Sequence, residues 1–215
     1  MPRGGAAEEG QALGSRAQAA VRLTLARMKN PLRLAIALSS VAAAWLSLTA
    51  PLAAQAREGI VSELLKDISD VETKVMALAK AMPDSAYAWR PGPGVRSTGE
   101  VFQHIAADNY FMPALMDKPA PKDTGITKEY KTAAAFEKKP MDRAAVLAEL
   151  TKSFEFLKSS LSSTTDAQLG AAMDVFGQKS TTRGLWITTA THLHEHLGQL
   201  IAYARSNKVT PPWSK

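Results

Sequence analysis

Residues 191–205 read THLHEHLGQLIAYAR, and this stretch holds three of the four histidines of the 215-residue chain. At the roughly 100° per residue of an α-helix, His192 and His196 lie one turn apart on the same side. His194 lies on about the opposite side and points to water. The pair flanks an apolar stripe made of Trp186, Leu193, Leu197, Leu200 and Ala204. A helix here would therefore present two imidazoles at its core edge, which is how one helix supplies two ligands to a metal ion.

A histidine pair with this spacing also occurs without a metal, either in solvent or with its polar atoms satisfied at the core edge. A three-histidine site needs one more ligand from another element, and His104 is the fourth and last histidine. It lies in residues 97–116, STGEVFQHIAADNYFMPALM, where a second amphipathic helix is expected. On spacing alone, a metal site and a structural pair both remain open.

The composition fits one globular domain, with 46% hydrophobic and 21% charged residues. The absence of cysteine excludes disulfides, cysteine-ligated zinc and a cysteine nucleophile. Residues 1–56 hold six of the 26 Lys and Arg and two of the 20 Asp and Glu, so the rest has a net charge of only +2. That balance, without a basic stripe, argues against nucleic-acid binding.

The excess positive charge near the start fits a signal peptide at residues 28–56, MKNPLRLAIALSSVAAAWLSLTAPLAAQA. Lys29 and Arg33 precede an apolar run, and Ala54-Gln55-Ala56 offers the small residues that precede a cleavage site. We expect residues 57–215 to be exported to the periplasm or secreted; an uncleaved membrane anchor is the alternative. Residues 1–27 are expected to be a disordered or untranslated leader, with Met28 as the start.

Helical periodicity dominates residues 57–215, which predicts an all-α domain, an antiparallel four-helix bundle. The four helices are expected at residues 59–82, from Ser97 to near Pro113, from Asp142 to about Ser160, and from Ser180 to about Asn207. Ser97 with Glu100 three residues later forms a capping-box pattern at the start of the second helix. A short helical piece is expected near residues 132–138. The segments 83–96, 118–127 and 162–180 are expected to be irregular.

Two stretches of this domain resemble the DinB-like metal-binding four-helix bundles. Residues 88–106, AWRPGPGVRSTGEVFQHIA, are similar to the family's entry into its second helix with a single histidine, and residues 191–205 are similar to its final-helix signature. The resemblance covers nearly all of residues 57–215. It implies that His104, His192 and His196 are the metal ligands. The chain departs from the pattern at Leu197, where many members have an arginine.

Three neutral imidazoles on a divalent ion leave coordination positions open to water or substrate, which is typical of a reactive site. Zinc suits three nitrogen ligands best, with nickel and iron as alternatives. Asp108 follows His104 by one turn and is expected as an acceptor for an imidazole N–H, as a weak fourth ligand, or as a solvated carboxylate. Gln199 and Tyr203 share the ligand side of the last helix and could orient water or substrate, although core-edge packing is favoured for Tyr203.

The resemblance implies a metal-dependent thiol S-transferase, since relatives include transferases and isomerases that use low-molecular-weight thiols. The implied partners are a small-molecule substrate and a thiol. The alternatives are metal-dependent hydrolysis and a non-catalytic, stress-associated metal-binding module that could form a homodimer through a helix face.

Overall fold

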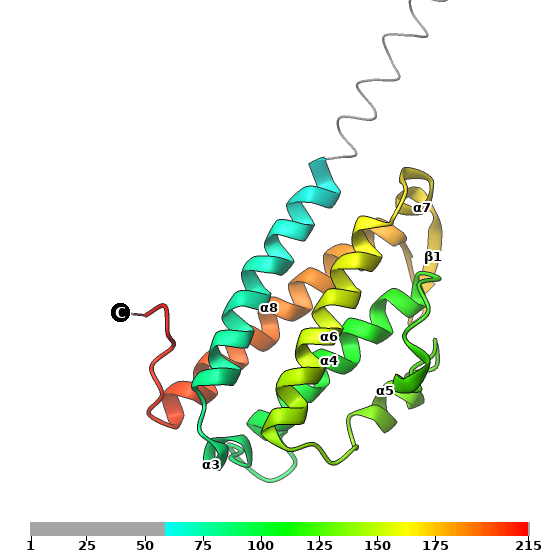
Figure 1. The fold of residues 1–215 in the computed structure, drawn as a ribbon. Coiled ribbons are helices and arrows are strands. Elements are labelled where there is room, and N and C mark those ends of the chain that lie inside the picture. Colours follow the sequence, from blue (N-terminus) through cyan, green and yellow to red (C-terminus); the bar gives the residue numbers. More distant parts are fainter. Residues whose placement is uncertain (1–58, 215) are drawn as a thin grey trace, which may run out of the picture. The chain divides into compact units, whose positions relative to one another are not determined.

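Residues 59–214 are described by the computed structural model, and four long helices dominate this part of the chain (Figure 1). They are a first helix at residues 59–81, α4 (Thr98–Leu115), α6 (Arg143–Ser162) and α8 (Thr182–Ser206). The shorter elements are α3 (Asp84–Tyr87), the 3-10 helix η1 (Lys122–Thr124), α5 (Tyr130–Phe136), α7 (Asp166–Gly170), β1 (Ala172–Val175) and β2 (Gln178–Thr181).

The expected leader at residues 1–27 and the expected signal peptide at residues 28–56 lie outside the described residues. Within residues 59–214, no helix has both the length and the apolar character needed to cross a bilayer.

The starts of the long helices follow from capping side chains. The capping box of α4 is confirmed, because the Glu100 N–H donates to Ser97 Oγ at 3.3 Å and the Ser97 N–H donates to Glu100 Oε2 at 2.7 Å. Asp142 caps α6 and Thr181 caps α8, each accepting a backbone N–H from the first turn. Each cap satisfies an N–H that the helix leaves free and typically stabilises the fold by about 1 kcal/mol.

The burial of α4 differs from the expectation of an amphipathic helix with one wet side. Residues 101–114 are all buried, because α5, α6 and α8 each pack against α4. Polar side chains are buried with the apolar ones, among them Gln103, His104, Asp108 and Asn109. Such groups are stable in the interior only with polar partners. The buried polar residues of α4 therefore form a polar cluster inside the bundle.

The directions of the helices are read from the contacts between them. His104 meets His196 and Asp108 meets His192, so α4 and α8 run antiparallel. By contrast, Tyr110 bonds Glu149 while Lys118, just beyond α4, bonds Ser163, so α4 and α6 run parallel. The bundle therefore departs from strict up-and-down order. The connection between these parallel helices carries α5 across the outside of α4 (Figure 1).

Two segments expected to be irregular contain short regular elements. Residues 83–96 include α3, and residues 162–180 include α7 and most of an antiparallel β1–β2 hairpin. The hairpin turns at Phe176 and Gly177, which both have positive φ, 53° and 82°. This is the backbone of a type I′ turn, which normally selects Asn or Gly. No strand was expected here, because the strands have only four residues each and Phe176 is atypical for the turn.

Candidate metal centre

The three histidines singled out by spacing and resemblance meet between α4 and α8. His104 comes from α4, and His192 and His196 come from successive turns of α8. One ring nitrogen of each lies within 4.8 Å of the other two, so the group could hold a metal ion. The Nε2 atoms of His192 and His196 are 3.1 Å apart. The structure thus brings together the residues expected as ligands, and their binding of an ion stays a prediction.

The second ring nitrogens of two histidines are fixed by acceptors. His104 Nδ1–H donates to Glu137 Oε1 at 2.8 Å, and His196 Nδ1–H donates to Gln199 Oε1 at 2.9 Å. An N–H at Nδ1 leaves the lone pair of a neutral imidazole on Nε2. Both Nε2 atoms therefore direct lone pairs into the space between the helices, which is the orientation a metal ion requires.

Asp108 enters the same space, and its side chain is only 10% exposed. Its Oδ2 lies 2.7 Å from His192 Nε2 and 3.3 Å from His104 Nε2. The possibility of a solvated carboxylate is therefore wrong. Asp108 contacts the Nε2 atoms, which would face the metal ion, and not the Nδ1 atoms. It is therefore placed as a possible ligand, and not as an acceptor for the outer N–H of a ligand.

The protonation of the cluster follows from its surroundings. The hydrogen bond to Asp108 raises the pKa of His192 above its ordinary value, although burial opposes this. Burial lowers the pKa of His196, and the nearby His104 and His192 add to that effect. Without a cation, a proton on His192 thus neutralises Asp108, while His196 is held in the neutral form that binds metals.

A chain of polar contacts surrounds the histidines. Arg96 Nη2 donates to Glu137 Oε2 at 2.9 Å, so Glu137 links Arg96 to His104. Burial would raise the pKa of Glu137, but the hydrogen bond from His104, and then the hydrogen bond and charge of Arg96, hold it below its ordinary value. Gln199 Nε2 donates to the Tyr203 hydroxyl at 3.0 Å, which in turn donates to the Arg96 carbonyl oxygen at 3.3 Å.

Glu137 and Arg96 were missed by the sequence reasoning. Glu137 lies 33 residues after His104, in the segment EKKP just beyond α5, where no spacing relates it to a histidine. Gln199 was expected to orient water or substrate and instead orients a ring. Tyr203 is buried at the core edge, as expected, and it also belongs to this polar chain.

His194 lies apart from the cluster, as its helical phase predicts. Its Nε2 is 3.0 Å from both carboxylate oxygens of Asp67 on the first helix, and the two side chains are 49% and 43% exposed. Leu197 is buried in the core.

Three of the donor–donor distances are compatible with one tetrahedral metal ion. Two ligands of one tetrahedral zinc ion are about 3.3 Å apart, given bond lengths near 2.0–2.1 Å. Asp108 Oδ2 lies 2.7 Å from His192 Nε2 and 3.3 Å from His104 Nε2, and the Nε2 atoms of His192 and His196 are 3.1 Å apart. The side chain of His192 is 26% exposed. His104, Asp108 and Glu137 form a second group that could hold a cation, and it overlaps the first.

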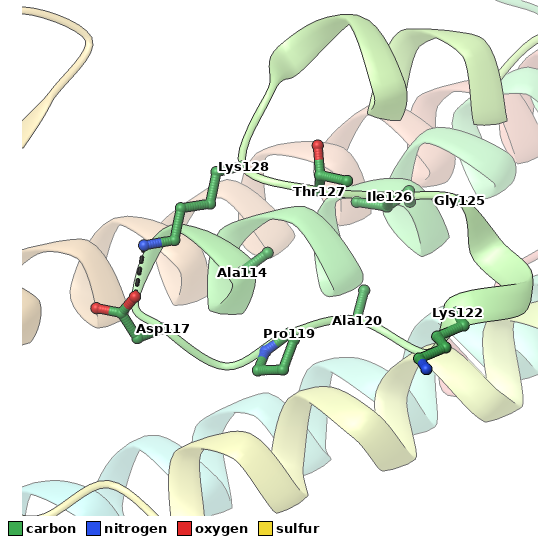
Figure 2. A pocket seen from close by; sticks show the side chains of 9 residues that line it. All are labelled: Ala114, Asp117, Pro119, Ala120, Lys122, Gly125, Ile126, Thr127 and Lys128. Carbon is green, nitrogen blue, oxygen red and sulfur yellow. Dashed lines mark hydrogen bonds and ion pairs between the residues drawn. The ribbon is translucent and has the colours of Figure 1, made fainter.

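A separate pocket lies beyond the end of α4. It has a volume of about 550 Å³, and its lining includes Ala120 and Ile126 but none of the histidines. Figure 2 shows the ion pair between Asp117 and Lys128 at its edge.

Comparisons with known proteins agree with this fold. The model of the DinB superfamily matches residues 67–200. A DinB-like protein from Bacillus subtilis superposes with a TM-score of 0.55 at 20% identity, over 71% of this chain and 97% of that one. A DinB-like protein from Bacillus cereus gives 0.57 at 20% identity, over 69% and 93%. A conserved protein from Enterococcus faecalis gives 0.55 at 14% identity, over 67% and 94%. No curated protein matches the chain.

Proposed function

The chain belongs to the DinB superfamily, and from this premise we propose that it is a divalent-metal-dependent transferase that adds a low-molecular-weight thiol to an electrophile. His104, His192 and His196 would hold the ion. The observation that carries the proposal is the meeting of their ring nitrogens beside Asp108, with the side chain of His192 26% exposed. Zinc suits the donor set best, and nickel or iron would also fit it.

In this proposal the ion would activate the thiol, and the side chains would orient the ligands and move the proton. A divalent ion at this site lowers the pKa of a thiol or water that it contacts. Glu137 and Gln199 hold His104 and His196 in one tautomer and one orientation. With an ion held by the three histidines, His192 Nε2 would be deprotonated, and Asp108 Oδ2 would be free of that hydrogen bond.

Asp108 is then placed to act as the base. Its Oδ2 accepts the proton as the thiol S–H bond breaks, and the sulfur forms a bond to the electrophilic carbon. The displaced group departs with the electron pair of its bond, and Asp108 then passes the proton to solvent or, where that group is basic, to the group itself. Burial of this carboxylate among the rings keeps bulk water from competing for the proton.

Metal content and turnover test this proposal together. The purified protein should contain close to one equivalent of a divalent metal, measured by elemental analysis. Zinc-, nickel- and iron-loaded samples are then incubated with chlorodinitrobenzene and either cysteine or glutathione, with His104→Ala as the blank. Metal-dependent, thiol-dependent release of chloride supports the transferase. Turnover of activated esters without a thiol would favour a metal-dependent hydrolase instead.

A non-catalytic metal-binding module is the second candidate, and the position of Asp108 favours it. If Oδ2 acts as a fourth ligand beside the three nitrogens, the shell closes and no position remains for substrate. Cobalt substitution separates the two. A visible spectrum that changes when thiol is added indicates an open position, whereas an unchanged four-coordinate spectrum would overturn the catalytic proposal.

We also propose that the mature protein is exported, on the basis of the n-region, apolar run and A-x-A site within residues 28–56. Intact-mass analysis of the protein from its producing cell should give a species that begins at Arg57. A species that still contains residues 34–50 would support a membrane anchor.

A further inference from the structure

A second cavity lies beside the metal centre, on the other side of Glu137. Its volume is about 710 Å³, within the range of small-molecule sites. It is bounded by residues 90–96, the first turns of α4, α5 and residues 137–141. Its charged lining residues are Arg90, Arg96, Lys138, Lys139, Glu100 and Glu137, an excess of two positive charges.

The two arginines keep donors available to this cavity. Arg90 donates Nη1 to the Val95 carbonyl oxygen at 2.7 Å and Nη2 to Glu100 Oε1 at 3.0 Å. Arg96 directs both Nε and Nη2 to a single oxygen, Glu137 Oε2. A guanidinium has five N–H donors, and these two side chains are 43% and 41% exposed.

Each carboxylate that pairs with one of these arginines also accepts a hydrogen bond from another group. Glu100 Oε2 accepts the Ser97 N–H of the capping box, and Glu137 Oε1 accepts the N–H of His104. Neither carboxylate gives its arginine the two-oxygen pairing that a guanidinium fork favours. A ligand carboxylate in the cavity could provide it.

We propose that this cavity binds a small organic anion, with its carboxylate on Arg90 and Arg96 and its apolar part against Val95, Tyr130 and Met141. The apolar wall selects an organic anion over an inorganic one. Because Glu100 and Glu137 share the wall, a single negative charge is favoured over the double charge of phosphate. Tyr130 lines the cavity and is 59% exposed, so part of its side chain is accessible to a ligand.

Binding in the cavity is coupled to the metal centre through Arg96, Glu137 and His104. A ligand carboxylate takes donors of Arg96, so more of the negative charge of Glu137 faces the N–H of His104. A stronger acceptor at Nδ1 makes the imidazole a stronger metal ligand. The anion and the metal ion should therefore each raise the affinity for the other by the same factor. This coupling rests on the proposed metal site, whereas anion binding to metal-free protein does not.

Calorimetric titration of the purified protein with benzoate and with inorganic phosphate tests the site, before and after removal of metal by a chelator. Benzoate should bind the metal-free protein, more tightly than phosphate, and several-fold more tightly after zinc is restored. Arg90→Gln should weaken benzoate binding at least tenfold, and Arg90→Lys should recover only part of the loss. Arg205→Gln, an exposed arginine outside the cavity, is the matched control and should bind as the parent does.

Three results would overturn the proposal: no benzoate binding without metal, no effect of Arg90→Gln, or phosphate binding as tight as benzoate. The first would place the anion on the metal ion itself. If zinc failed to bind at all, the proposed function and the coupling would fall together, while benzoate titration of the metal-free protein would still decide the anion site. Circular dichroism of each variant checks that it is folded.

Discussion

Two histidine–aspartate pairs, two residues apart on α8, differ in almost everything except their chemistry. His192 meets Asp108 of α4 at 2.7 Å, with side chains 26% and 10% exposed. His194 meets Asp67 of the first helix at 3.0 Å, with side chains 49% and 43% exposed. The first pair adjoins two further imidazoles, and the second is an exposed ion pair.

The difference shows that burial and nearby imidazoles, more than the paired aspartate, determine whether a histidine–aspartate pair could bind a metal ion. Exposed ion pairs contribute little to stability, because water solvates both charges in the unfolded chain as well. At the buried pair, the loss of water strengthens each polar contact and makes an unpaired group costly. The same two residue types therefore form a candidate metal site at one position and a surface contact at the other.

The largest expected effect is the loss of zinc affinity when a histidine of the metal cluster, and not His194, is replaced by alanine. Alanine in place of His104, His192 or His196 should lower zinc affinity by more than the roughly 10–100-fold typical of losing a supporting contact, because a ligand itself is removed. His194→Ala should leave affinity within about twofold of the parent. Competition titration with a zinc chelator measures both. If His194→Ala lost as much zinc affinity as the other variants, the two histidine–aspartate pairs would not differ in function.

A smaller loss is expected when the support of a ring is weakened. Glu137→Gln keeps an acceptor for His104 Nδ1–H but removes the charge that faces Arg96, so zinc affinity should fall by about 10–100-fold. Glu129→Gln is the matched control, because Glu129 forms an exposed pair with Lys131. The same titration serves. An affinity equal to that of the parent would show that Glu137 does not act on the site.

The pH dependence of the metal-free protein probes the buried pair directly. Because Asp108 raises the pKa of His192, the stabilisation from this pair is fully present below the unfolded value near 6.5 and is lost as pH rises through the higher folded value. Asp108→Asn should therefore lower the free energy of unfolding most between about pH 5 and 6.5, by roughly 1.5 kcal/mol. Urea unfolding at a series of pH values measures the difference.

The opposite pH trend of His196, whose pKa is lowered by burial, is present in both proteins and largely cancels in that comparison. A difference between parent and Asp108→Asn that grew from pH 6 to pH 9 would contradict the assignment.

The smallest effect is expected at the exposed pair. Asp67→Asn should change the free energy of unfolding by no more than about 0.5 kcal/mol, because both side chains remain solvated. Added salt should reduce even that change, because mobile ions screen exposed charges. Urea unfolding at low and high salt gives the measurement. A loss as large as that of Asp108→Asn would remove the distinction between the pairs.

Much of this arrangement could be predicted from the sequence, and the remainder has identifiable physical reasons. The spacing of Ser97 and Glu100 predicted the capping box, and the helical periodicity of α8 predicted that His192 and His194 lie on different sides of the helix. His104 was predicted as the third ligand because it is the one remaining histidine, and the family resemblance implied the same. The β1–β2 hairpin was missed because its strands are too short to alternate recognisably.

The side of a helix on which each histidine lies, and the residues at which the helices begin, follow from local sequence, because both depend on residues within a few positions of one another. The carboxylate that each imidazole meets follows from the packing of the helices. The antiparallel contact of α4 with α8 put Asp108 against His192, and the connection that carries α5 along α4 brought Glu137 to His104 and Arg96. Those contacts join residues 33 to 84 positions apart, where no local pattern operates and packing alone selects the partner.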